Sequence, residues 1–120
     1  MSSLNTFGAI MTFAIELEGQ LRDFFRAAGA EQAAGAADKR RATLERVRRE
    51  NVTEIKLEPI EGLSEADYAI DFSDTSAAGQ QAAAGAAARF YADVAPKLNV
   101  REAQRALERC GKQYAELAGA

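Results

Sequence analysis

The sequence predicts a mainly α-helical protein: a four-helix bundle with one long crossover between the second and third helices, and a small β-hairpin within that crossover. Four segments, at about 4–28, 31–51, 75–95 and 100–118, repeat apolar residues or alanine at three- and four-residue steps. Within the intervening segment, 52–73, two runs alternate apolar with polar residues. The chain has 120 residues, 48% of them hydrophobic, which fits one domain with a core of its own.

The first predicted helix is the most hydrophobic segment. Ser3 or Asn5 can cap its beginning, and Gly29 is placed to end it as a C′ residue. At about 100° per residue, Glu18 falls within the apolar stripe, whereas Glu16 points to the opposite side. An ionised carboxylate is costly in such surroundings unless it has a partner. The stripe itself consists of Phe7, Ile10, Met11, Ala14, Leu17, Leu21, Phe24, Phe25 and Ala28.

The second predicted helix is strongly basic. The face that carries Leu44 and Val47 also carries Arg40 or Arg41. We interpret the two basic runs, 39–41 and 46–49, as a solvated face whose aliphatic stems lie along the core. The alternative interpretation is a basic docking stripe for an acidic partner.

The segment 52–73 predicts the β-hairpin. Residues 52–58 and 66–72 alternate apolar with polar side chains, and Pro59 and Gly62 lie between the two runs. Two strands alone are marginally stable, so the hairpin must lie on the helices or pair with a second subunit. The alternative is an irregular crossover of the same length.

The third helix is alanine-rich, begins near Thr75 and is stopped by Pro96. Asn99, with Glu102 at N3, predicts the start of the fourth helix. Apolar stripes carry Tyr91 on the third helix and Cys110 and Tyr114 on the fourth. We expect both tyrosine rings in the core with their hydroxyls at its margin, and the thiol as a small buried filler.

Composition excludes several classes of function. The chain has no histidine, which excludes the usual Ser-His-Asp and Cys-His catalysis and removes the commonest transition-metal ligand. The net charge of −3 argues against nucleic acid as a partner. The single cysteine favours a reducing compartment, and the N-terminal segment fits neither a signal peptide nor a membrane span. We therefore expect a cytoplasmic protein. The thin, alanine-rich core favours a homodimer or higher homo-oligomer.

Two helical hairpins joined by a long link, with the phrase AIELEGQLRDFF in the first helix, resemble the ferritin-like superfamily of the rubrerythrin type. In that family the first and third helices each supply a glutamate, and the second and fourth each supply Glu-x-x-His, which together hold two irons. Glu18, seven residues before Phe25, matches the first-helix glutamate. The third-helix position, seven residues before Tyr91, is Ala84.

When the two remaining motifs of the family are placed on this sequence, arginine stands at both histidine positions. The second-helix motif falls on Asp38 to Arg41, and the fourth falls on Glu102 to Arg105. Both histidines of the family are thus missing. The resemblance therefore implies a ferritin-like bundle without the usual di-iron site and without a cofactor.

Three hypotheses for Glu18 remain open from the sequence. It forms a buried pair with Arg40 or Arg41, whose guanidinium replaces the positive charge of a metal. It lies at the edge of a wide stripe and reaches water or a dimer seam. It joins other carboxylates, including those of a symmetry-related chain, to bind iron or another divalent metal.

Two functions follow from these hypotheses. The first is a non-catalytic ferritin-like protein that acts as a homo-oligomer or partner-binding module. The alternative is a carboxylate-based metal-binding or iron-handling protein, an oxidase or a store.

Overall fold

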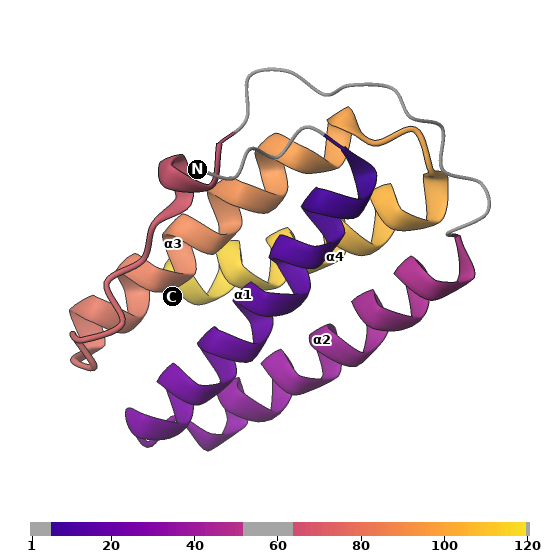
Figure 1. Cartoon of the computed structure of the whole chain (residues 1–120). Coiled ribbons are helices and arrows are strands. Elements are labelled where there is room, and N and C mark those ends of the chain that lie inside the picture. Colours follow the sequence, from indigo (N-terminus) through magenta and orange to yellow (C-terminus); the bar gives the residue numbers. More distant parts are fainter. Residues whose placement is uncertain (1–5, 52–63, 120) are drawn as a thin grey trace.

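The computed structural model describes residues 6–51 and 64–119, and over these residues the protein is mainly α-helical, as predicted. Two 3-10 helices flank the third long helix, η2 (Glu65–Tyr68) before it and η3 (Ala95–Lys97) after it. None of the described helices is both long and apolar enough to cross a membrane. The long helices, drawn in Figure 1, are α1 (Phe7–Ala27), α2 (Glu31–Glu50), α3 (Ala77–Val94) and α4 (Arg101–Gly119).

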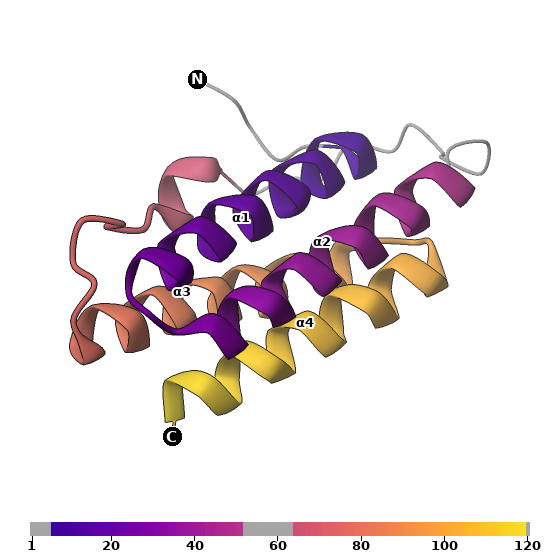
Figure 2. The same cartoon turned by 90° about the horizontal axis from the view of Figure 1, so that it is seen from below.

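The four helices form two antiparallel hairpins that pack against each other. α1 pairs with α2, α3 pairs with α4, and the two hairpins meet where α2 lies along α4 and α1 along α3. Figures 1 and 2 show that α2 ends at the opposite end of the bundle from the start of α3. As a result α2 and α3 run in the same direction, and the chain between them has to return along the length of a body that measures 41 by 25 by 23 Å.

Local capping sets the limits of the helices. α1 starts after Thr6, whose hydroxyl accepts a hydrogen bond from the Ala9 N–H at 3.0 Å, so the predicted caps at residues 3 and 5 were placed too early. Gly29 ends the α1 turn with φ of +80°, as its C′ role predicts. α4 begins at Arg101, so the predicted cap at Asn99 is wrong.

One contiguous core runs through all four helices. α1 contributes the bulky residues, whereas α3 contributes mainly small ones. The small side chains of α3 let it pack closely against α4, its hairpin partner, whereas α1 meets α3 through large side chains such as Phe13 and Phe90, whose rings lie 4.9 Å apart. The fully enclosed α3 side chains are Ala84, Ala87, Phe90, Tyr91 and Val94.

The predicted β-hairpin is not seen in the part of the chain that the structure describes. Its first run, 52–58, lies outside the described residues, and its second run forms η2 followed by an extended segment; among the described residues there is no strand. The alternation has a different cause. Tyr68, Ile70 and Phe72 turn toward the helices, while the residues between them face solvent. An extended chain lying on a helical bundle has the same two-residue period as a strand in a sheet.

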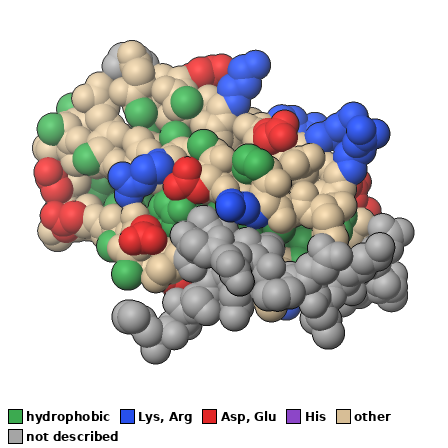
Figure 3. Space-filling model, turned by 90° about the horizontal axis from the view of Figure 1, so that it is seen from above, with side chains coloured by type: hydrophobic (Ala, Val, Ile, Leu, Met, Phe, Trp, Pro, Cys, Tyr) green, Lys and Arg blue, Asp and Glu red, His purple; other side chains and the backbone are tan. Residues whose placement is uncertain are grey.

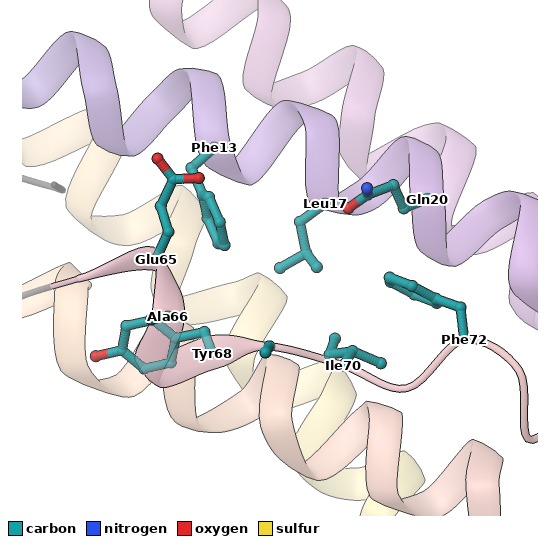
Figure 4. A pocket seen from close by; sticks show the side chains of 9 residues that line it. Phe13, Leu17, Gln20, Glu65, Ala66, Tyr68, Ile70 and Phe72 are labelled. Carbon is teal, nitrogen blue, oxygen red and sulfur yellow. The ribbon is translucent and has the colours of Figure 1, made fainter. Parts of the chain in front are cut away.

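Aromatic contacts fasten this extended segment to the bundle. The Tyr68 ring lies 5.2 Å from the Phe90 ring of α3, and the Phe72 ring lies 5.6 Å from the Phe24 ring of α1. Figure 4 shows the groove of about 430 Å³ that remains between the segment and α1, where Phe13, Leu17 and Ile70 turn toward one another. Residues 68–72, in the last part of the crossover, thus pack as part of the core of the protein.

Candidate functional site

Glu18 lies at the centre of the bundle with no exposed surface. Its Oε1 atom is 3.0 Å from Nε of Arg40 on α2, and the arginine side chain is only 9% exposed. The structure therefore forms the expected buried carboxylate–guanidinium pair, with Arg40 as the partner. The periodicity of α1 accounts for the interior position of Glu18, because the same stripe that carries Leu17 and Leu21 into the core also carries Glu18.

Two phenols complete the surroundings of the carboxylate. The Tyr91 hydroxyl of α3 donates a hydrogen bond to Oε2 of Glu18, and the Tyr114 hydroxyl of α4 donates one to Oε1, both at 2.5 Å. The two rings stack with centroids 6.0 Å apart and planes 6° from parallel. The prediction that these hydroxyls lie at the margin of the core is wrong, because both point to its centre. Glu18, Arg40, Tyr91 and Tyr114 are called the buried cluster below.

Arg40 links the buried cluster to the surface. Its NH2 group donates to the Tyr114 hydroxyl at 2.8 Å, and its NH1 group donates to the Gln113 amide oxygen at 2.7 Å. The guanidinium carbon also lies 4.2 Å from the centroid of the Tyr114 ring, in cation–π geometry. Each helix thus contributes one member, and every buried polar side-chain atom in the described part of the chain has a hydrogen-bond partner.

Burial sets the direction of the pKa shifts of the Glu18 carboxyl, the two phenols and the neighbouring Cys110 thiol. Desolvation raises the pKa of Glu18, while the charge of Arg40 and the hydrogen bonds from the two phenols oppose that rise. Burial, and next the negative charge of Glu18, raise the pKa of both Tyr91 and Tyr114. The same two causes raise the pKa of the Cys110 thiol to about 12. Neither phenol nor the thiol therefore titrates near neutral pH, where a general acid or base would have to act.

Two of the other residues singled out in the sequence lie outside the cluster. The Asp38 carboxylate is 60% exposed and lies 3.2 Å from NH1 of Arg22. The Arg41 side chain is 40% exposed, and its Nε lies 3.4 Å from Oε1 of Glu45, one turn further along α2. Both belong to the solvated surface of the hairpin formed by α1 and α2.

Glu102 also lies at the surface, 47% exposed. Its Oε1 atom accepts a hydrogen bond of 2.8 Å from Asn51 Nδ2, and its Oε2 atom lies 3.7 Å from NH1 of Arg46. Glu102 therefore joins the end of α2 to the start of α4 and does not reach the buried cluster.

The residues present do not fit a di-iron site. A single carboxylate, that of Glu18, enters the cluster, and Ala84 is fully buried at the position where the resemblance implies a second. A guanidinium 3.0 Å from that carboxylate occupies the place of a cation and would repel one. Nowhere in 6–51 or 64–119 do three or more aspartate, glutamate or cysteine side chains gather in a way that could hold a metal ion.

No protein-family model, curated protein or solved structure matches this chain. The functional interpretation therefore depends on the cluster geometry and on the surfaces of the bundle. The sequence identified Glu18 and narrowed its partner to Arg40 or Arg41, but it missed the roles of Tyr91, Tyr114 and Gln113. The available signal was chemical: a buried carboxylate needs several hydrogen-bond donors, and these two tyrosines were the ones on the stripes of the third and fourth helices.

Proposed function

We propose that this protein is a non-catalytic bundle of ferritin-like arrangement that has lost its di-iron site and acts by associating with another protein chain, in the first place a second copy of itself. The observation that carries the proposal is the state of Glu18. Both of its oxygens accept hydrogen bonds, and its charge is matched by Arg40 at 3.0 Å. Each oxygen thus already has a hydrogen-bond donor, and the carboxylate has no exposed surface at which a metal ion or substrate could reach it.

The helix directions support the ferritin-like part of the proposal. Two antiparallel hairpins with α2 and α3 running in the same direction have the connectivity of a bundle with one long crossover. One polar residue from each helix meets at the middle of the bundle, where proteins of that superfamily hold metal. In this proposal, guanidinium and phenol groups have taken over the role of metal in neutralising the first-helix glutamate.

The face formed by α3 and α4 supports the association. A shallow groove of about 300 Å³ between these helices is lined mainly by small apolar side chains, among them Ala88, Ala92 and Ala115. A face of small side chains lets a second helix approach closely, which increases the area that association can bury.

Size-exclusion chromatography with light scattering tests the association. We expect a mass above that of one chain for the wild-type protein and a monomer for Ala92→Glu, which places a charge in the α3–α4 groove. The matched control is Ala42→Glu, at an exposed alanine of α2, which should keep the wild-type mass. A wild-type protein that stays monomeric at all concentrations refutes self-association.

Elemental analysis tests the loss of the metal site independently. We expect the protein purified from metal-supplemented medium to contain no stoichiometric iron, manganese or zinc. Bound metal at one or two ions per chain that disappears in a Glu18→Gln variant would refute the proposal.

A further inference from the structure

A groove of about 540 Å³ opens between α2 and α4, directly outside the buried cluster. Figure 2 shows these two helices side by side on the face turned toward the viewer. The groove follows one face of each helix, since its lining positions repeat at three- and four-residue steps. They are Ala36, Lys39, Arg40, Thr43 and Arg46 on α2 and Ala106, Arg109, Cys110 and Gln113 on α4.

The lining is positively charged although the chain as a whole carries −3. Four of the nine lining residues are cationic and none is acidic. Arg46 is neutralised by Glu50 at 2.9 Å, but Lys39 and Arg109, which lie on opposite walls, have no ion-pair partner among the described residues. Unpaired like charges that face a shared groove favour an anion between them.

Arg40 supplies a buried donor at the base of the groove. Its three hydrogen bonds to Glu18, Gln113 and Tyr114 use three of the five N–H groups of a guanidinium. One N–H on each terminal nitrogen remains without a partner in the described part of the chain. Gln113, whose own side chain is exposed, places a neutral amide oxygen 2.7 Å from NH1, in a position that a charged oxygen of a ligand would fill more favourably.

The floor of the groove is apolar. Ala106 and Cys110 are buried there, and Ala36 is half-buried. The groove is within the usual size range of small-molecule sites, about 300–1,000 Å³. A ligand that fits it therefore combines a charged oxygen group with a small apolar body.

We propose that the α2–α4 groove binds a small organic oxyanion, a carboxylate or a phosphate ester, through Lys39, Arg109 and the free N–H groups of Arg40. Thr43, on the wall between Lys39 and Arg46, offers a hydroxyl to the same ligand. This site is independent of the proposed association, which uses the α3–α4 face. Figure 3 shows the opposite face of the molecule, where basic, acidic and hydrophobic side chains are intermixed.

Titration of the full chain with three probes tests the site: phenyl phosphate, phenylacetate and inorganic phosphate, each at constant ionic strength. Calorimetry measures affinity, and amide chemical shifts locate the binding. We expect saturable one-to-one binding of at least one aryl probe, with shifts concentrated on the groove faces of α2 and α4. The better aryl probe identifies phosphate or carboxylate as the preferred group, and inorganic phosphate should bind several-fold more weakly because it leaves the apolar floor uncovered.

Paired charge removals provide the control. The double variant Lys39→Gln/Arg109→Gln should weaken binding about tenfold or more, because each residue donates a charge-assisted hydrogen bond. The matched variant Arg49→Gln/Arg105→Gln removes the same charge from exposed positions of the same helices outside the groove and should change affinity less than about twofold. Circular dichroism verifies that both variants fold.

Three outcomes would overturn the proposal. The first is no saturable binding of either aryl probe at millimolar concentration, which is also the result expected if the groove accepts only an acidic protein segment. The second is equal weakening by the two double variants, which indicates general attraction to surface charge. The third is equal affinity for inorganic phosphate and both aryl probes, which indicates an adventitious ion only.

Discussion

Arg40→Met should leave Glu18 as a charge without a counterion in the centre of the bundle. Methionine retains most of the aliphatic volume of arginine but donates no hydrogen bond. Glu18 would keep the two phenol donors and lose the guanidinium 3.0 Å away. Removing one partner of a buried ion pair typically destabilises a protein by about 3–5 kcal/mol.

Protonation of Glu18 limits this cost. The ordinary pKa of the carboxyl is 4.5, so protonating it at pH 7, 2.5 pH units higher, costs about 3 kcal/mol at roughly 1.4 kcal/mol per unit. Burial already raises the pKa of Glu18 in the wild-type protein, and loss of the Arg40 charge raises it further. The folded variant then binds a proton that the unfolded chain releases above pH 4.5. Its stability must therefore fall as the pH rises from 4.5 toward the raised pKa.

Urea unfolding followed by circular dichroism at pH 7 and pH 5 measures the effect. We expect Arg40→Met to lose about 3 kcal/mol of stability at pH 7 and less than about 1 kcal/mol of charge-related stability at pH 5. Arg41→Met, which removes an exposed pair with Glu45, should lose about 0.5 kcal/mol or less. The double variant Glu18→Gln/Arg40→Met should recover most of the loss at pH 7, since no charge is then stranded.

A loss below about 1 kcal/mol at pH 7, or a loss that is the same at pH 5 and pH 7, would refute this reasoning. The first result would mean that water reaches Glu18 in solution. The second would mean that the loss reflects packing and not charge.

Three further experiments test other parts of the structure. Tyr91→Phe removes the donor at Oε2 of Glu18 and should cost about 1–3 kcal/mol in urea unfolding; an unchanged midpoint would show that this hydrogen bond is not formed in solution. Gly111→Ala should destabilise the protein in urea unfolding, because the new Cβ would lie 2.8 Å from Cβ of Tyr91. Gly35→Ala, which has open space around it, should instead stabilise α2 by about 0.5–1 kcal/mol. Equal effects of the two substitutions would contradict the close contact between α3 and α4. Cys110 should react with a thiol reagent at pH 8 at least about a hundredfold more slowly in the folded protein than in urea. Its pKa of about 12 keeps the thiolate fraction small, and its 4% exposure limits access of the reagent. Fast labelling of the folded protein would mean that α4 opens readily.

The sequence was sufficient for the helices and for the interior position of Glu18. Both depend on the 3.6-residue period, a local property that each segment displays by itself. The period placed Glu18 among Leu17, Leu21 and Phe25, and the structure leaves it with no exposed surface. The same local reasoning failed at 66–72, because alternation reports which side of an extended chain is buried and not whether another strand lies beside it.

Tertiary packing decided which residues meet Glu18. Arg40 and Arg41 are adjacent and lie about 100° apart around α2, so only the rotation of α2 against α1 selects between them. Tyr91 and Tyr114 are 73 and 96 residues away along the chain, and their hydroxyls reach the carboxylate because the two hairpins pack at a particular depth and angle. The apolar pattern of a helix indicates which of its sides is buried. Which side chains of the other helices contact that side depends on how the helices pack together, and the sequence of one segment does not contain that information.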